Sequence, residues 1–152
     1  MKKIILMCLS LALAVSVLSA CNTGKQAEDG GDTTGGTQTE VSYKDGSYKA
    51  EADSFDEHGW KPVITIEVKD GKISSVDYDE VNEAGASKET DEEYNKNMKD
   101  KVGLGPAEAI PQLEKDLVEK QDVNAVDTVT GATGTTNNFK TMANKALEEA
   151  KN

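Results

Sequence analysis

Hydrophobic and polar residues alternate along three segments between residues 48 and 78, with the period of two that is typical of strands with one buried face. The apolar positions are Tyr48, Ala50 and Ala52 in the first segment, Ile64, Ile66 and Val68 in the second, and Val76 and Tyr78 in the third. Asp70 and Gly71 separate the second and third segments, and this dipeptide is typical of a two-residue hairpin. Ile73 is out of phase with Val76 and Tyr78, which indicates a bulge or a second buried face. The three segments predict an antiparallel sheet.

The period changes to that of amphipathic helices in the second half of the chain. The last helix has the clearest apolar stripe, formed by Phe139, Met142, Ala143, Ala146, Leu147 and Ala150. A second stripe is formed by Ile110, Leu113 and Leu117. Pro106, before this stripe, suits a first helical turn, whereas Pro111 predicts either a kinked helix or a helix that begins there.

A further helix is predicted after Thr90, because Thr90-Asp91-Glu92-Glu93 has the form of a capping box. Tyr94, Met98 and Val102 follow at intervals of four residues, on one face of that helix. Since the strands precede the helices, the sequence predicts an α+β domain in which helices pack on an antiparallel sheet.

The beginning of the chain has the layout of a secretory signal peptide. Two lysines precede an uncharged apolar run, Ile4–Val17, that is too short to span a bilayer. The following Leu18-Ser19-Ala20-Cys21 resembles the lipobox of bacterial lipoproteins, which implies cleavage after Ala20 and a diacylglyceryl group on Cys21. An ordinary signal peptide with a nearby cysteine is the alternative. We expect residues 1–20 to be a lipoprotein signal peptide and the mature chain to be lipid-anchored on the extracytoplasmic face of the cell membrane.

Residues 21–40 are expected to be a lipid-anchored tether. From Asn22 to Thr39 the chain is mostly Gly, Thr, Asp, Gln and Lys, and it cannot bury enough apolar surface to offset its chain entropy. A disordered segment of this length has a mean reach of roughly 20–25 Å, from about 5–6 Å times the square root of the number of residues. Residues 41–152 then form one folded domain.

The net charge restricts the partners of the mature chain. The whole sequence carries −11, and removal of the signal peptide with its two lysines leaves −13. Such a surface repels nucleic acid and anionic lipid headgroups, which excludes both as binding partners. The chain contains no arginine, so a free phosphate ligand would lack a bidentate guanidinium clamp. This composition favours a ligand held by a covalent bond and by backbone amides.

The segment from Asp127 to Thr136 reads D-T-V-T-G-A-T-G-T-T and leads directly into the last predicted helix. Its two glycines let the backbone approach a bound group closely, and a helix N-terminus offers outward N–H groups and a dipole that favours an anion. These features are compatible with a phosphate site. They are equally compatible with a capped helix start, in which Thr135, Thr136 or Asn137 is the cap.

The order of residues in this segment is similar to the flavinylation motif D-x-x-T-G-A-T-x-T of the FMN-binding domain family. In that family an FAD-dependent flavin transferase joins FMN, through its phosphate, to the hydroxyl of the last Thr or Ser of the motif. The resemblance implies FMN as the cofactor and Thr135 as the attachment residue, in the loop before the C-terminal helix. It implies that the transferase reads Asp127 or uses it to bind its metal, with a plain turn aspartate as the alternative. The residues expected to shape the loop around the phosphate are Thr130, Gly131, Ala132 and Thr133.

Three further stretches resemble the small flavin-binding lipoproteins of Gram-positive bacteria. They are Phe55–Pro62 (F-D-E-H-G-W-K-P), the Asp-Gly hairpin and Tyr94-x-x-x-Met98. The resemblance implies that Trp60, Tyr94 and Met98 contribute to the flavin pocket. An indole offers a flat surface on which a flavin can stack, whereas the alternative for Trp60 is an aromatic residue of the core or its rim.

Other chemistry has little support in the sequence. His58 is the single histidine and cannot form a convincing zinc site or a useful catalytic triad. The acidic stretch from Asp77 to Glu93 lacks the spacing of an EF-hand loop and is expected to be a solvated face. We predict neither a metal site nor catalytic residues.

The resemblance implies a carrier that shuttles electrons from a membrane electron donor to an external electron acceptor, rather than an enzyme with its own substrate. Two alternatives remain open. The domain could bind a small ligand as a solute-binding lipoprotein, or the signal peptide could be the precursor of a pheromone. In the second case Leu13–Ala20 would be the matching peptide.

Overall fold

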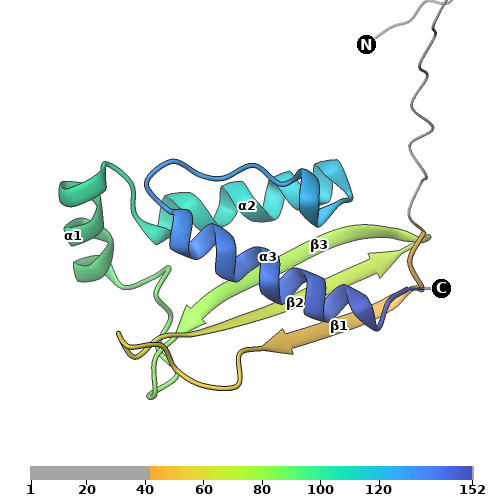
Figure 1. Ribbon diagram of the computed structural model, residues 1–152, viewed down its shortest axis with the longest axis horizontal. Coiled ribbons are helices and arrows are strands. Elements are labelled where there is room, and N and C mark those ends of the chain that lie inside the picture. The colour runs from red at the N-terminus through yellow and green to blue at the C-terminus, as the bar shows by residue number, and fades with distance from the viewer. Residues whose placement is uncertain (1–41, 152) are drawn as a thin grey trace, which may run out of the picture. The chain divides into compact units, whose positions relative to one another are not determined.

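The computed structural model describes residues 42–151 (Figure 1). The predicted signal peptide, the lipidated Cys21, the tether and the segment Leu13–Ala20 lie outside the described residues. Within residues 42–151, no helix combines the length and the apolar character needed to cross a membrane.

Three antiparallel strands form one sheet in the order β1-β2-β3, with β1 at Gly46–Glu51, β2 at Lys61–Lys69 and β3 at Lys72–Val81. Asp70 and Gly71 form the predicted hairpin, and their φ angles of 54° and 77° give the left-handed backbone that this turn requires. The pairing shifts between Glu67 and Val68, and Val68 pairs with Ile73. The bulge brings Ile73 to the buried face of the sheet, which explains its phase in the sequence.

Three α-helices and one short 3₁₀ turn follow the sheet. They are α1 at Glu92–Val102, α2 at Pro106–Lys120, η1 at Val123–Ala125 and α3 at Thr133–Glu148. Helices α2 and α3 cover one face of the sheet, α2 against β3 and α3 against β1 and β2, while α1 lies beyond the end of the sheet (Figure 1). The predicted α+β fold, with helices packed on an antiparallel sheet, is confirmed.

One hydrophobic core lies between the sheet and these two helices. The predicted apolar stripe of α2 is fully buried, at Ile110, Leu113 and Leu117. Phe139, the first residue of the predicted α3 stripe, is fully buried as well. The rings of Tyr78 and Phe139 meet edge to face, with their centroids 5.2 Å apart, and so join β3 to α3. Burial of apolar surface, at roughly 25 cal/mol per Å², fixes α3 on the sheet and hence the place of its first turn.

The predicted start of α1 was wrong. The carboxylate of Asp91 accepts a hydrogen bond from the Tyr94 N–H (2.9 Å), so Asp91 and not Thr90 caps α1. No residue of α1 is buried and Val102 is 46% exposed, so the apolar stripe of this helix does not join the core. The alternative of a helix that begins at Pro111 is excluded as well, because α2 begins at Pro106.

The two ends of the described chain meet at one end of the sheet. Tyr43 pairs with Lys151, and the Lys44 N–H donates to the Ala150 carbonyl at 2.8 Å. The C-terminal end of α3 therefore lies beside the start of the domain. The N-terminal end of α3 lies about 24 Å away, since the helix has 16 residues with a rise of about 1.5 Å each.

Candidate functional site

The predicted motif runs from the end of η1 into the first turn of α3. The helix begins at Thr133, with Ala132 at the N-cap position and no side-chain cap. The N–H groups of Thr133, Gly134 and Thr135 therefore have no carbonyl partner four residues back within the helix. The first N–H to form such a bond is that of Thr136, which donates to Ala132 O at 2.9 Å. Unpaired N–H groups at the positive end of a helix dipole suit a bound anion.

Two neighbouring threonines of this turn have different surroundings. Thr136 has no exposed surface, and its hydroxyl donates to Ala132 O (2.9 Å) and accepts from the Val129 N–H (3.3 Å). Thr135 is partly exposed, and within residues 42–151 its hydroxyl has no hydrogen-bond partner. The capping role considered for Thr135, Thr136 or Asn137 is wrong, because α3 begins earlier. Thr135 lies inside the first helical turn and not in the loop before it.

Thr135 borders a small depression between α1 and the first turn of α3. The other lining residues are Lys88, Tyr94, Met98, Leu104, Gly105, Pro106, Gly131 and Ala132. The depression measures about 30 Å³, whereas pockets that enclose a small ligand measure about 300–1,000 Å³. A large ring bound here would lie at the protein surface. The structure thus brings the predicted Tyr94, Met98, Gly131 and Ala132 together with Thr135.

The other predicted residues lie outside this depression. Asp127 and Thr130 border a separate groove beside α2, and the exposed Asp127 carboxylate pairs with Lys120 at 2.7 Å. Thr133 is exposed. Trp60 is 7% exposed, and its ring packs against the ring of Tyr94 at 73° with the centroids 5.5 Å apart. Trp60 therefore supports Tyr94 and offers little open surface for stacking.

Gly131 gives the motif loop a backbone that other residues adopt with strain. Its φ is +89°, and a Cβ at this position would lie 3.1 Å from the Val102 carbonyl oxygen. We expect Gly131→Ala to lower the free energy of unfolding by about 1–3 kcal/mol in urea denaturation. Gly134→Ala is the matched control, because a Cβ there would meet no described atom within 4 Å and alanine favours a helix. Equal losses in both variants would contradict the strain assigned to Gly131.

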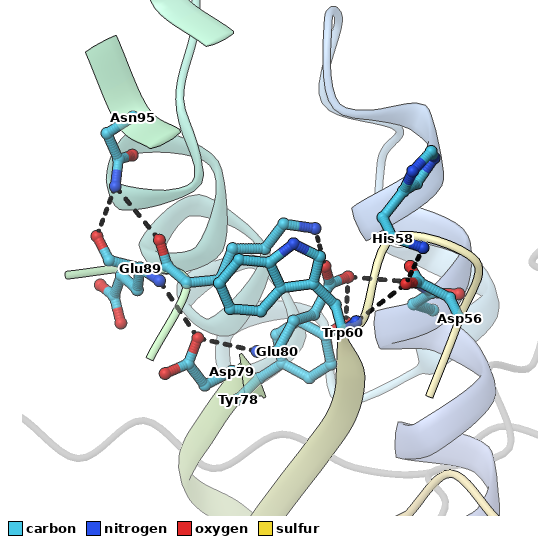
Figure 2. Close-up of polar contacts among 10 residues, drawn as sticks. Asp56, His58, Trp60, Tyr78, Asp79, Glu80, Glu89 and Asn95 are labelled. Atoms are coloured by element: carbon cyan, nitrogen blue, oxygen red, sulfur yellow. Dashed lines mark hydrogen bonds and ion pairs between the residues drawn. The ribbon is translucent and has the colours of Figure 1, made fainter. Parts of the chain in front are cut away.

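A buried ion pair borders the same depression. The ammonium of Lys88 pairs with the carboxylate of Glu80, and the two side chains are 9% and 1% exposed. The carboxylate also accepts hydrogen bonds from the Tyr78 hydroxyl (3.0 Å) and from Asn138 Nδ2 (3.1 Å). Tyr78, Glu80 and Trp60 are labelled among the polar contacts of this region in Figure 2. Residues of β3 and α3 thus hold one cation next to Thr135.

The expectation of a solvated acidic face is wrong for Glu80 and Lys88. The burial of Glu80 could have been predicted from the strand pattern. Glu80 continues the alternation of Val76 and Tyr78, so its side chain points to the buried face. A buried carboxylate requires a partner. The sequence does not show which lysine provides it.

Asn95 of α1 fixes the loop that carries Lys88. Its side-chain nitrogen donates to the carbonyl oxygens of Lys88 (3.2 Å), Glu89 (2.8 Å) and Asp91 (2.8 Å). Its side-chain oxygen accepts from the Ala107 N–H at 2.8 Å. One side chain therefore joins the Lys88 loop to the first turns of α1 and α2.

Glu114 of α2 is a half-buried carboxyl group behind β3. Burial raises its pKa to about 7 from 4.5, a shift that the hydrogen bond from the Tyr78 N–H (2.7 Å) opposes and the charge of Glu89 reinforces. The folded protein thus holds this proton more tightly than the unfolded chain does. Its contribution to stability is fully present below pH 4.5 and is lost as the pH rises to about 7.

Glu114→Gln should remove this pH dependence, because the amide oxygen can still accept the Tyr78 N–H but does not titrate. We expect the wild-type protein to lose of the order of 1 kcal/mol more than the variant between about pH 4.5 and pH 7, a value reduced by the partial exposure of the group. Urea unfolding of both proteins at the two pH values measures the difference. Identical losses would show that another group is responsible.

A helix N-terminus with an unbonded hydroxyl, beside an aromatic and cationic depression, is the kind of site that suits a phosphorylated cofactor. Residues 59–148 match the family described as FMN-binding domain. The 15 kDa lipoprotein of Treponema pallidum (strain Nichols) is 34% identical over 110 residues, which cover 72% of this chain and 78% of that protein. The chain belongs to the FMN-binding domain family, and its cofactor is FMN.

One solved structure agrees with the fold, and a second is similar in sequence. A crystal structure of the CPE2226 protein from Clostridium perfringens is 47% identical with a TM-score of 0.69, covering 71% of this chain and 88% of that chain. A solution structure of a Clostridium thermocellum protein is 36% identical with a TM-score of 0.48, covering 70% of this chain and 91% of that one.

Proposed function

We propose that this protein is a membrane-anchored flavoprotein that carries FMN on Thr135 through a phosphoester and passes electrons from a membrane oxidoreductase to an external acceptor. The main support for this proposal is the difference between the hydroxyl groups of Thr135 and Thr136. The Thr136 hydroxyl is buried and bonded to the motif backbone, whereas the Thr135 hydroxyl borders the depression and is available for reaction. The N–H groups of the same turn can bind the phosphate that an ester on Thr135 would bring there.

The size of the depression explains why a covalent bond is useful. At about 30 Å³ it cannot enclose an isoalloxazine ring, so most of a bound FMN would stay exposed to solvent. Tyr94 and Met98 are among the residues that offer apolar surface to the ring. The chain also has no arginine to bind the phosphate as a free anion. FMN supplies the redox chemistry once it is bound, and an ester bond keeps it on a protein outside the cell.

The attachment requires FAD and a flavin transferase. The Thr135 oxygen forms a bond with the phosphorus on the FMN side of FAD, the pyrophosphate bond breaks, and AMP leaves while the hydroxyl proton is released. Asp127 and Thr130 border the groove beside α2, which shares Leu104 with the depression at Thr135. A transferase that reaches Thr135 could therefore contact Asp127 as well.

The name of the Treponema pallidum relative, a 15 kDa lipoprotein, supports the proposed lipid anchor on Cys21. The net charge of −13 on the mature chain then keeps it away from anionic headgroups and steers it towards partners with basic surfaces. These two properties suit a carrier that moves between a donor in the membrane and an acceptor outside it.

Intact mass spectrometry after co-expression with a flavin transferase tests the proposal. We expect the wild-type protein to gain the mass of one FMN less one water, and to gain nothing when the transferase is absent. A second flavinylated protein, expressed in the same cells, shows that the transferase is active. If that protein is labelled and this one is not, the covalent carrier is excluded.

A further inference from the structure

Lys88 brings a positive charge to the depression that Thr135 borders. Its ammonium lies 5.2 Å from the centroid of the Trp60 ring and 4.9 Å from that of the Tyr94 ring, within the range of cation–π attraction. Glu80 pairs with the ammonium as well. Two rings and one carboxylate therefore fix the position of the cation.

Stability alone gives a weak reason for burying this pair. The removal of two charges from water costs free energy that their attraction recovers only in part, and apolar residues of similar volume often serve as well. Within residues 42–151, Glu80 is the one hydrogen-bond acceptor of Lys88 Nζ. An ammonium has three N–H donors, so donors remain for a group bound in the depression.

The groups that hold Glu80 also connect it to the attachment turn. Asn138, which donates to Glu80, lies three residues after Thr135 and on the same side of α3. Burial and the negative charge of Glu80 raise the pKa of Tyr78 above its ordinary value, so this hydroxyl stays protonated and donates. The cation and the attachment hydroxyl are thus held in one rigid frame.

Resting on the proposed function, we propose that Lys88 contacts the FMN carried by Thr135 and raises its reduction potential, and that Glu80 is a positioning residue for the ammonium. A flavin gains negative charge when it is reduced, and a cation fixed beside it stabilises the reduced form over the oxidised form. By the same reasoning the charge of Glu80 lowers the reduction potential, because a negative charge disfavours the negative charge of the reduced flavin.

Midpoint potentials of the labelled full-length protein test this inference, measured by equilibrium titration of the flavin absorbance. We expect Lys88→Met to lower the potential by about 30 mV, which corresponds to about tenfold in the equilibrium constant of a two-electron couple. Glu80→Gln should raise it, and Lys88→Arg should keep it close to the wild-type value. Lys145→Met is the matched control, because it removes a lysine charge from the far end of α3 and should leave the potential nearly unchanged.

The opposite signs distinguish an electrostatic role from a structural one. If Lys88 and Glu80 only hold the fold together, both variants should disturb the site and move the potential in the same direction, which would overturn the inference. The double variant Lys88→Met/Glu80→Gln has no unpaired buried charge, so it provides folded protein if a single variant does not fold. The double variant loses the Lys88 cation, which is nearer to the flavin than Glu80 is, so its reduction potential should still be lower than that of the wild type. An unchanged potential in the double variant would overturn the inference. Wild-type protein that carries no label at all would instead exclude the proposed function, and this inference with it.

Discussion

Thr135→Ala is expected to give a folded, colourless protein with no flavin fluorescence on a denaturing gel. The phosphoester requires a hydroxyl at this position, and alanine has none. Thr135 neither caps α3 nor hydrogen-bonds through its side chain within residues 42–151, so the free energy of unfolding should change by no more than about 0.5 kcal/mol. Retained stability would show that the variant loses the attachment point and not the fold.

Neighbouring hydroxyls provide the controls for this experiment. Thr135→Ser keeps a hydroxyl and should keep part of the label. Thr136→Ala should lose about 1–3 kcal/mol, because it removes a buried hydroxyl with two hydrogen bonds, but it should remain labelled. Thr133→Ala should be labelled as well, since that side chain is exposed. A fluorescent Thr135→Ala band would place the ester on another residue.

Cys21→Ser is expected to move the protein from the membrane to the soluble fraction. Only a thiol can form the diacylglyceryl thioether, so a serine at this position cannot carry the lipid. Phase separation in detergent measures the change. The flavin label should persist in the released protein, because Thr135 belongs to the folded domain.

Cys8→Ser is the matched control for the anchor. Cys8 lies within the predicted signal peptide, so its replacement should leave the mature protein unchanged and fully membrane-bound. Equal partition of the Cys21→Ser variant and the wild-type protein into detergent would exclude a lipid on Cys21.

The sheet and the packed helices were predictable because burial repeats with the period of each element. Ile64, Ile66 and Val68 face the core at every second residue, and Phe139 begins a helical stripe that the structure buries. The residue at which α3 begins was harder to predict from the sequence. Gly-Ala-Thr-Gly-Thr-Thr offers several possible caps, and the structure uses the backbone of Ala132 with none of the hydroxyls.

The candidate site was predictable only in part, for a similar reason. The order of residues around Thr135 identified the motif, because that information is local. The ion pair of Lys88 and Glu80 depends on how the chain after β3 returns to the sheet, and the bond from Asn138 joins residues 58 positions apart. The exposure of Trp60 depends on the same contacts. The spacing of residues along the sequence does not show which distant residues contact one another.

The bridge between Tyr43 and Lys151 has a consequence for how an anchored domain would exchange electrons. The chain enters the domain beside the C-terminal end of α3, and Thr135 lies near the other end of that helix, about 20 Å away. If Cys21 is held in the bilayer, the length of the linker between Cys21 and Tyr43 decides whether the flavin can reach a donor in the membrane. A shortened linker should then slow reduction of the flavin by that donor while leaving its oxidation by an external acceptor unaffected.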